Sequence, residues 1–429
     1  MSTDFLTPQS IPATAGTPGA AASPTAAPRV RRDKPLATEH FPPQARFILP
    51  LLQRLQYGAL RVEFADGQSA LYGDESHPLT LTLNNWEVFS ATLKSGDIGF
   101  AETFIDGHWH TDNLPALVEL MVRNRDAIES LIYGTWWGSL MYRLRHLFNR
   151  NSKAGSRKNI HAHYDIGNDF YQLWLDPSMT YSSALFSDGH VENLQDAQQA
   201  KYQRILDQIN IAPGGRILEI GCGWGGFAEV AARRAAAQVT GLTLSTEQLQ
   251  FANRRLAEAG VVDQVELRLQ DYRDTHGEFD GIASIEMFEA VGEAYWPSYF
   301  ECIARNLKSG ARACIQTITI DNALFERYRK GTDFIQQYIF PGGMLPSPQV
   351  FCQAAEKHGL KVVNQFAFGL DYARTLAEWR SAFNEQLPGV AAQGFDDRFL
   401  RTWEFYLAYC EAGFRAGSID VMQFTLEKP

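Results

Sequence analysis

The stretch Arg216-Ile217-Leu218-Glu219-Ile220-Gly221-Cys222-Gly223-Trp224-Gly225-Gly226-Phe227 decides the fold of this chain. Its apolar start has the composition of a buried strand, and the glycines after it predict a tight turn that leads into a helix. Glycine accepts positive φ angles and lets a ligand approach the backbone closely. The free amides at the start of a helix favour an anionic group such as a carboxylate. We therefore expect a ligand at this turn; the alternative is a turn with a purely structural role.

The chain around this turn alternates strands and helices, which predicts an α/β fold with a mostly parallel sheet. Further strands are expected at residues 238–242, 265–269, 279–285 and 311–318, and helices at 197–209, 245–259 and 299–306. Ligands of such sheets bind at the carboxyl ends of the strands. The residues expected at five of these ends, and therefore in one crevice, are Gly221, Thr243, Asp271, Glu289 and Gln316.

Composition bounds the class of protein. The chain has 429 residues, which is enough for two or three domains, and its 45% hydrophobic and 21% charged residues are typical of globular proteins. A formal net charge of -10 argues against bulk binding to nucleic acid. Residues 1–40 are rich in Ala, Pro, Thr and Ser, and we expect them to form a disordered tail. Its basic run, Arg29 to Lys34, is interpreted as a solvated charge cluster, with a weak lipid contact as the alternative.

The cysteines and the apolar runs indicate a compartment. The five cysteines lie far apart without metal-ligand spacing, which favours a reducing cytosol over a disulfide framework. No apolar run is long enough to span a bilayer, and no signal-peptide core follows the N-terminus. We therefore expect a cytoplasmic protein whose membrane contact, if it has one, is peripheral.

Residues 41–150 are interpreted as a small N-terminal α+β domain, followed by a catalytic domain over 151–429. Helices are expected at 46–55, 86–93 and 115–122, and strands at 60–64, 70–72 and 79–83, with a hairpin turn at Asp66-Gly67. His108 and His110 flank Trp109. We interpret them as surface or packed histidines rather than a metal pair, and we expect no metal site.

The segment from Tyr133 to Arg150 is a candidate membrane-docking surface. Trp136 and Trp137 begin a row of apolar residues at helical spacing, and arginines share the segment. No Asp or Glu occurs between Ser130 and Tyr164, so this part of an acidic protein is locally basic and suited to anionic lipid. The alternative is an ordinary amphipathic helix packed between domains.

Several motifs together resemble the cyclopropane fatty acid synthase family, which includes the mycolic acid methyltransferases. The resemblance covers about Gly99 to the C-terminus, and the leading domain is similar to that of the long bacterial members. The motifs that carry it, besides the glycine turn, are His163-Tyr164-Asp165-Ile166-Gly167-Asn168-Asp169-Phe170, Asp176-Pro177-Ser178-Met179-Thr180-Tyr181-Ser182-Ser183, Gly241-Leu242-Thr243-Leu244-Ser245, Gln270-Asp271-Tyr272-Arg273-Asp274, Phe288-Glu289-Ala290-Val291-Gly292, Tyr338-Ile339-Phe340-Pro341-Gly342-Gly343 and Asp371-Tyr372-Ala373-Arg374-Thr375-Leu376.

The resemblance implies a Rossmann-like class I methyltransferase domain and a reaction. The family transfers the methyl group of S-adenosyl-L-methionine (AdoMet) to the cis double bond of an acyl chain, which leaves a carbocation on that chain. A base then removes a proton, and in the family a bound bicarbonate lies where the base is needed. Loss of the proton from the new methyl group closes a cyclopropane ring, whereas loss from a neighbouring chain carbon gives a methyl-branched product.

The resemblance also implies site residues. The AdoMet-binding positions are Tyr181, Ser182, Glu219, Gly221, Gly223, Gly225, Thr243, Leu244, Gln248, Asp271 and Tyr272. The catalytic and bicarbonate-site positions are Glu289, Ile318, Tyr372, Ser183 and Gln316. The last two depart from the family, which has cysteine and histidine there, and Ala290 replaces a further histidine. Serine and glutamine still donate hydrogen bonds but carry no positive charge, so methyl transfer is expected while ring closure is in doubt.

The first hypothesis is therefore an AdoMet-dependent methyltransferase that forms cyclopropane fatty acids on unsaturated membrane phospholipid, working at the inner membrane face. Bicarbonate is an expected second ligand. The alternatives are a methyl-branched product without ring closure, a small-molecule methyltransferase, and a non-catalytic protein that binds lipid or AdoMet. The sequence leaves open whether the chain forms a homo-oligomer.

Overall fold

The computed structural model describes residues 37–73, 77–132, 166–186 and 193–429. Residues 36–429 belong to one compact unit. Residues 1–36 of the predicted tail and the candidate docking segment Tyr133 to Arg150 lie outside the described residues. The end of the predicted tail is a correction, because Thr38–His40 forms a 3-10 helix. The division into domains at residue 150 stays a prediction.

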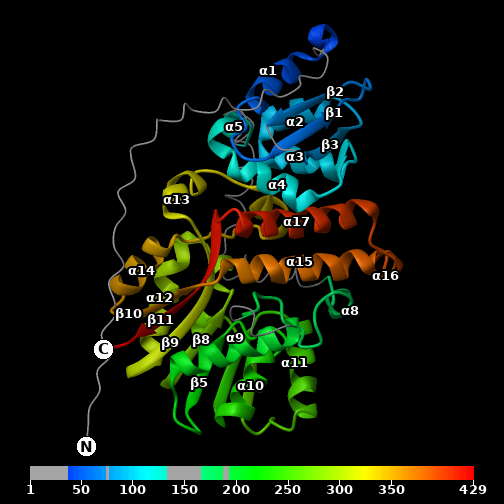
Figure 1. The fold of residues 1–429 in the computed structure, drawn as a ribbon. Helices are drawn as coiled ribbons and strands as arrows, with labels where there is room; N and C mark the ends of the chain where they lie inside the picture. Colours follow the sequence, from blue (N-terminus) through cyan, green and yellow to red (C-terminus); the bar gives the residue numbers. More distant parts are fainter. Residues whose placement is uncertain (1–36, 74–76, 133–165, 187–192) are drawn as a thin grey trace, which may run out of the picture. The chain divides into compact units, whose positions relative to one another are not determined.

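A seven-stranded sheet forms the centre of the fold, in the order β10-β11-β9-β8-β5-β6-β7 (Figure 1). Strands β5 to β9 are mutually parallel, and β11 runs antiparallel to both β9 and β10. The strands are β5 (Arg216–Ile220), β6 (Gln238–Thr243), β7 (Val265–Leu269), β8 (Phe279–Ile285), β9 (Leu307–Ile320), β10 (Lys361–Ala367) and β11 (Ile419–Glu427). The predicted α/β class is confirmed, as are the five parallel strands.

Strands β10 and β11 are absent from the predicted set. In β11 the stretch from Met422 to Glu427 alternates apolar and polar residues, a strand signal that the sequence analysis missed. The structure also buries the polar side chains of Gln423 and Thr425 fully. β9 is also longer than the predicted 311–318, because β11 pairs with it from Arg312 to Ile320 and Leu307 pairs with Phe279 of β8.

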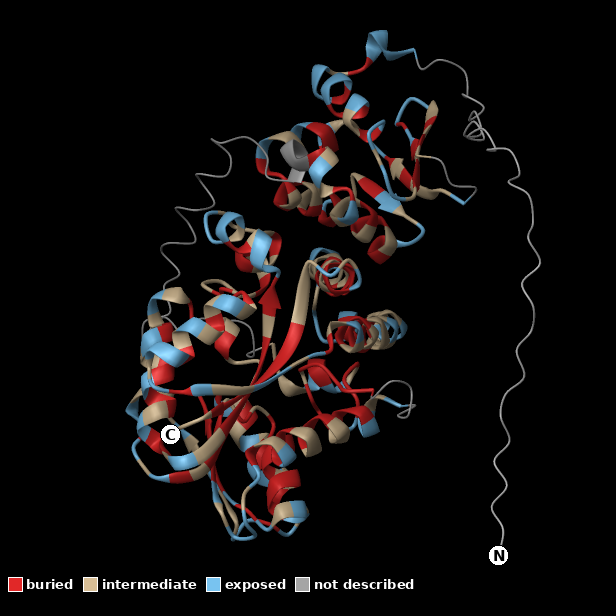
Figure 2. Ribbon diagram, turned by 60° about the vertical axis from the view of Figure 1, so that its left-hand side comes forward, coloured by how far each residue is buried: buried red, intermediate tan, exposed pale blue. Residues whose placement is uncertain are grey.

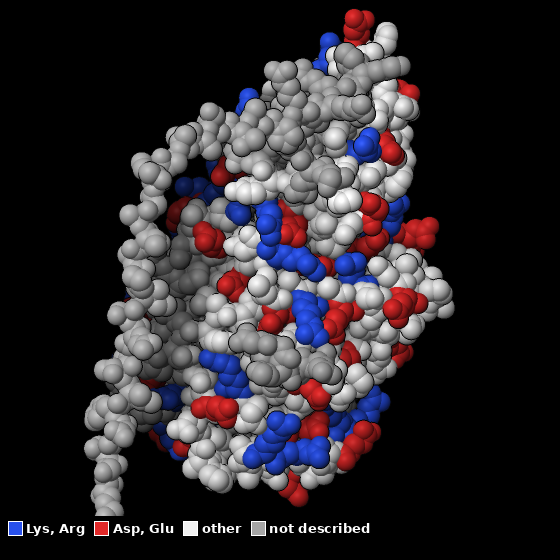
Figure 3. All heavy atoms as spheres, viewed as in Figure 1, with Lys and Arg blue, Asp and Glu red and all other residues white. Residues whose placement is uncertain are grey.

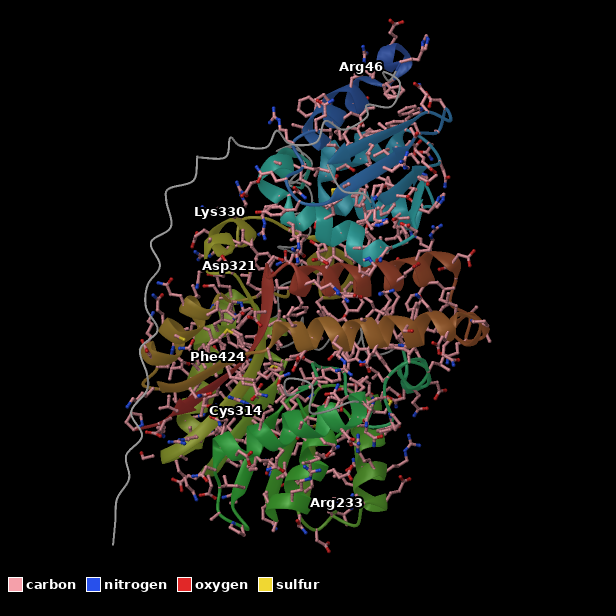
Figure 4. The ribbon with its side chains drawn as sticks, in the orientation of Figure 1. Arg46, Arg233, Cys314, Asp321, Lys330 and Phe424 are labelled. Atoms are coloured by element: carbon pink, nitrogen blue, oxygen red, sulfur yellow. The ribbon has the colours of Figure 1, made fainter. Side chains whose placement is uncertain are left out.

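Helices cover both faces of the large sheet. Successive strand residues point to opposite faces, so Ile217 packs in the cluster with α9 and α10 while Leu218 packs in the cluster with α12 and α14. Cys314 on β9 and Phe424 on β11 divide in the same way (Figure 4). Figure 2 shows the buried residues concentrated along these strands. The helices are α9 (Leu194–Ile209), α10 (Gly226–Ala235), α11 (Thr246–Glu258), α12 (Trp296–Asn306) and α14 (Pro348–Lys357).

Residues at the helix ends explain where two of the predicted helices begin. The side chain of Ser245 accepts a hydrogen bond from Gln248 N at 3.2 Å, so Ser245 is the N-cap of α11 as predicted. α12 begins three residues before the predicted Tyr299, with Pro297 in its first turn, where the missing amide hydrogen costs nothing. α15 (Gly369–Glu385), α16 (Leu387–Ala392) and α17 (Asp397–Arg415) follow towards the C-terminus.

The short elements of this part of the chain connect the longer ones. They are α8 (Asn168–Gln172), α13 (Asn322–Tyr328), the 3-10 helices η3 (Tyr272–Asp274), η4 (Phe288–Ala290) and η5 (Glu293–Tyr295), and one π-helical turn, η6 (Ile335–Ile339). In the part of the chain that the structure describes, no helix is long and apolar enough to cross a membrane.

The N-terminal part contains a four-stranded sheet in the order β2-β1-β3-β4. The predicted hairpin is confirmed, with Gly67 at a φ of +83° in its turn. Trp109 on β4 is buried while His110 beside it is exposed, and the described residues hold no metal-binding cluster. The elements are η1 (Thr38–His40), α1 (Pro43–Leu52), β1 (Ala59–Glu63), β2 (Ser69–Gly73), β3 (Leu79–Leu83), α2 (Glu87–Ser95), α3 (Asp97–Ile105), β4 (Trp109–Thr111), α4 (Leu114–Arg123) and α5 (Arg125–Ile132).

The N-terminal elements pack on the C-terminal helix pair. α3 and α4 contact α17, and the rings of Phe104 and Phe405 lie 5.6 Å apart. The hydroxyl group of Tyr409 donates to Asp97 Oδ2 at 2.7 Å. Burial raises the pKa of Asp97 to about 7. This contact buries polar as well as apolar side chains.

Candidate active site

A pocket lies at the carboxyl ends of β5, β6 and β8, where the glycine turn, the 179–182 segment and the turn after β8 meet. It encloses about 1160 Å³ of space, including its mouth. Its lining residues are Met179, Thr180, Tyr181, Ser182, Tyr202, Glu219, Ile220, Gly221, Cys222, Gly223, Trp224, Gly226, Leu242, Thr243, Leu244, Gln248, Gln270, Asp271, Tyr272, Arg273, Ile285, Glu286, Met287, Ala290 and Val291. Pockets at this edge of a parallel sheet bind ligands across many α/β folds.

The three glycines predicted to bind AdoMet differ in role. Gly221 and Gly223 line the pocket with φ angles of +89° and +50°. A Cβ atom built on Gly223 meets nothing within 4 Å, so this glycine borders open pocket space. Gly225, at a φ of +81°, is not among the lining residues, and a Cβ atom there would lie 3.0 Å from Ala252 Cβ. Gly225 therefore allows α10 to pack on α11.

Glu219 is one of three acidic residues that line the pocket, with Asp271 and Glu286. Its side chain is 2% exposed, and Oε2 has no hydrogen-bond partner among the described residues. Burial raises the pKa of Glu219 to about 8, and the nearby Lys201 opposes this shift. A buried carboxylate oxygen without a partner fits a cationic ligand group. The ammonium group of AdoMet has this character, so the residues present fit AdoMet.

The other predicted AdoMet contacts all line the same pocket. Thr243 Oγ1 donates to Gln248 Oε1 at 3.1 Å, which orients both side chains. Asp271 forms a two-pronged ion pair with Arg273, with Oδ1 2.8 Å from Nε and Oδ2 2.6 Å from Nη2. Carboxylate oxygens accept more than one hydrogen bond, so Asp271 retains capacity for a ligand.

Lys201 on α9 is a buried cation that the sequence analysis missed. It is 0% exposed, and its Nζ atom donates to Ser182 Oγ and Gln198 Oε1, both at 2.6 Å. Burial lowers the pKa of Lys201 to about 7, against the attraction of Glu286, which is the largest opposing charge. The available signal was its place on the apolar face of α9, one turn from Ala197 and Ile205, where a lysine is uncommon.

The predicted catalytic residues gather around Glu286, which was not predicted. Its Oε1 atom accepts hydrogen bonds from Ser183 N and from Gln316 Nε2, both at 2.8 Å. Its Oε2 atom accepts from the Tyr372 hydroxyl group at 2.7 Å. Glu286 directly follows β8, three residues before Glu289. An acidic residue at the end of a parallel strand was the signal that could have found it.

Glu289 occupies a separate position. Its Oε1 atom accepts from the backbone amide of Ile318, and its Oε2 atom has no partner among the described residues. Burial, and secondly the charge of Glu286, raise the pKa of Glu289 to about 8. Burial also raises the pKa of Glu286, but hydrogen bonds from Tyr372, Gln316 and Ser183 and the charge of Lys201 oppose that shift. Glu286 therefore has more hydrogen-bond donors that favour its ionised form than Glu289 has.

Ser183 and Gln316 differ from the expected arrangement in one respect. The Ser183 hydroxyl group donates to the carbonyl oxygen of Ala184 at 3.0 Å, so the backbone amide of Ser183, not its side chain, serves this cluster. Gln316 does donate through its side chain, as expected. These donors already bind the carboxylate of Glu286, so the cluster does not fit a bound bicarbonate.

The fold and the pocket together define a class of protein. A seven-stranded sheet of this order, a glycine turn after β5, a buried carboxylate on β5 without a partner among the described residues and an open pocket beside it are the parts of an AdoMet-dependent methyltransferase. Comparisons with known proteins agree. The family model described as mycolic acid cyclopropane synthetase matches residues 151–424. The chain belongs to this family.

The alignments with two curated relatives extend over most of the chain. "Tuberculostearic acid methyltransferase UfaA1" of Mycobacterium tuberculosis is 37% identical over 86% of this chain and 87% of its own length. "Cyclopropane-fatty-acyl-phospholipid synthase" of Escherichia coli is 35% identical over 82% of this chain and 89% of its own length. The solved structure of mycolic acid cyclopropane synthase CmaA1 complexed with SAH and CTAB is also similar. It has a TM-score of 0.59 and 31% identity, and the match covers 63% of this chain and 98% of that one.

Proposed function

We propose that this protein transfers the methyl group of AdoMet to the cis double bond of an unsaturated acyl chain in membrane phospholipid and forms a cyclopropane fatty acid. The name of the Escherichia coli relative supports the substrate class. The observation that carries the proposal is Glu286, a carboxylate that lines the methyl-donor pocket and is held by three hydrogen bonds. Methylation of an alkene needs such a base, because the chain must lose a proton afterwards.

The pocket residues would bind and orient the methyl donor. Glu219 would pair with its ammonium group, and the open backbone at Gly223 would accept its close approach. AdoMet supplies an electrophilic methyl group, and the attack of the double bond leaves a positive charge on the acyl chain. Binding in this pocket would hold the double bond in line with the methyl group, and exclusion of water by the bound chain would protect the cation from hydration.

Aromatic side chains beside the pocket are suited to that positive charge. Tyr181 lines the pocket, and its ring lies 5.3 Å from Trp379, 5.4 Å from Tyr171 and 5.7 Å from Trp174. The faces of aromatic rings attract cations, by roughly 0.5–2 kcal/mol for each contact. Tyr181, which packs against these three buried rings, is therefore a favourable neighbour for a carbocation.

A methyl-branched product is a second candidate. It is favoured by the name of the 37% identical relative, a tuberculostearic acid methyltransferase. Both products need the same methyl transfer and the same base, and they differ only in which proton is lost. The replacement of the family's cysteine and histidine by Ser183 and Gln316 changes the surroundings of that step.

The proposal includes a peripheral position at the inner membrane face. Figure 3 shows acidic and basic side chains intermingled over the described residues of one face. That face therefore offers no patch of one sign for anionic lipid. The support for docking is the basic, tryptophan-containing segment from Tyr133 to Arg150.

Product analysis tests the proposed function. Purified protein would be incubated with AdoMet labelled in its methyl group and with vesicles of unsaturated phospholipid, and the released fatty acids analysed by mass spectrometry. We expect labelled cyclopropane fatty acid. The variants Glu289→Gln and Tyr372→Phe should each lower turnover, because Tyr372 donates a hydrogen bond to Glu286 and Glu289 is a second carboxyl group close to Glu286. Full activity in both variants, or no labelled lipid from the wild type, would refute the proposal.

A further inference from the structure

We infer that the carboxylate of Glu286 is itself the proton-removing base of this enzyme and takes the place that bicarbonate fills in the family that the sequence resembles. This inference rests on the proposed function for its substrate. It makes the enzyme independent of bicarbonate and adds a catalytic residue that neither the family motifs nor the expected site contains.

The first argument is the convergence of donors on Glu286. Ser183 N and Gln316 Nε2 each lie 2.8 Å from Oε1, and the Tyr372 hydroxyl group lies 2.7 Å from Oε2. A carboxylate and bicarbonate share the same planar O–C–O unit, so the same donors bind either anion. Because these donors belong to three of the five residues at the expected bicarbonate-site positions, the Glu286 side chain fills that anion site from within the chain.

The second argument is that the direction of the Gln316 bond is fixed. Arg204 donates from Nη1 to Gln423 Oε1, and arginine has no acceptor atoms. Gln423 must therefore use its amide nitrogen towards Gln316, which it does at 2.9 Å to Oε1. Gln316 is left with its own NH₂ group facing Glu286. These hydrogen bonds fix the NH₂ group of Gln316 as a donor towards Glu286, and an ionised carboxylate is a strong acceptor for it.

The third argument is the backbone of Glu286. Its φ angle is +50°, in the left-handed region, where a residue with a side chain costs ~1 kcal/mol or more relative to glycine. Such strain persists where the surrounding structure requires it, and it gathers at functional sites. Glu286 is also the member of this hydrogen-bonded group that lines the pocket, whereas Gln316 and Tyr372 lie behind it.

The charges that face Glu286 come from two elements. Lys201 on α9 attracts it, and Glu289 on η4 repels it when ionised. The three hydrogen-bond donors on its oxygens and the charge of Lys201 favour the ionised form of Glu286 and oppose the effect of burial, which raises its pKa. A carboxylate in this state accepts a proton from a carbocation, which is a far stronger acid.

The proposed reaction begins with transfer of the methyl group. The π electrons of the double bond form the bond to the methyl carbon, and the carbon–sulfur bond breaks with its electron pair on sulfur. A C–H bond of the new methyl group then breaks. Its electron pair closes the three-membered ring onto the cationic carbon, and its proton goes to Glu286. The carboxylic acid formed must release this proton to solvent before the next turnover, and no oxidant or reductant is needed.

Two variants of Glu286 separate the possibilities. Glu286→Gly relieves the backbone strain and leaves an anion-sized gap between the three donors. Glu286→Gln keeps the shape but removes the charge. We expect the wild type to work equally well with bicarbonate removed and restored. Both variants should lose about 10²–10⁴-fold in turnover in bicarbonate-free buffer. Added bicarbonate or formate should raise the turnover of Glu286→Gly at least tenfold. It should leave the turnover of Glu286→Gln unchanged.

A binding measurement gives a readout apart from turnover. Titration with ¹³C-labelled bicarbonate, followed by NMR, should show binding to Glu286→Gly and none to the wild type, while AdoMet binding by both proteins shows that they are folded. Bicarbonate-dependent turnover of the wild type, bicarbonate binding by the wild type, or full activity of Glu286→Gln would each overturn the inference. A wild type that methylates no lipid would refute the proposed function, and the titration would still decide whether Glu286 fills the anion site.

Discussion

The buried carboxylate of Glu219 makes AdoMet binding depend on pH in a way that can be worked out from the structure. Burial raises its pKa to about 8, so it is mostly protonated at neutral pH in the ligand-free protein. Pairing with the ligand's ammonium group requires the ionised form. Each pH unit below 8 then costs up to ~1.4 kcal/mol of binding, or about tenfold in affinity. Between pH 8 and pH 6 the wild type should lose up to ~100-fold, and Lys201, whose pKa lies at about 7, moderates this change.

The variant Glu219→Gln should remove this dependence. It cannot ionise, so its AdoMet affinity should be low at pH 8 and nearly flat between pH 6 and 8, as measured by isothermal titration calorimetry. Glu258→Gln, the same chemical change at an exposed position on α11, is the matched control and should behave as the wild type. Wild-type affinity that ignores pH over this range, or unchanged affinity of Glu219→Gln at pH 8, would refute the reasoning.

The same pKa shift should make the ligand-free protein less stable as the pH rises, whereas its affinity for AdoMet rises. The folded-state pKa of Glu219 lies above its ordinary value of 4.5, so the folded protein binds the proton more tightly than the unfolded chain. This contribution to stability is present below pH 4.5 and is lost as the pH rises through 8. Without ligand, Glu219→Gln should therefore be more stable than the wild type at pH 8, by an amount on the order of 1 kcal/mol or more. Chemical denaturation measures it, and a less stable variant at pH 8 would contradict the burial argument.

Two further predictions concern the glycine turn and the membrane. Gly223→Val should abolish measurable AdoMet binding because its side chain enters the pocket. The control Gly214→Val, at a glycine that also has a positive φ angle and open space around it, should cost ~1–2 kcal/mol of stability and leave AdoMet affinity unchanged. Equal AdoMet affinities of the two variants in calorimetry would show that the ligand lies elsewhere. Binding to vesicles that contain anionic lipid should weaken as salt rises and should fall when Trp136 and Trp137 are replaced by alanine, and co-sedimentation insensitive to both changes would refute docking through this segment.

The sequence by itself determined the fold class and most of the ligand pocket. The glycine turn, the N-cap at Ser245 and the apolar strands are local patterns, and each follows from the conformational preferences of neighbouring residues. Ten of the eleven residues predicted to bind AdoMet line the pocket, and the exception, Gly225, serves the packing of α10 on α11. The family resemblance supplied these positions because their motifs are short and contiguous.

Only the tertiary structure decided what the predicted catalytic residues contact. Ser183, Gln316 and Tyr372 lie far apart in the chain, and their convergence on Glu286 depends on the pairing of β9 with β8 and on the placement of α15. The direction of the Gln316 bond depends in turn on Gln423 of β11, which lies opposite Gln316 only because β11 pairs with β9. Hydrogen bonds between residues distant in sequence leave no periodic signal, so the role of Glu286 could not be derived before the strands were in place.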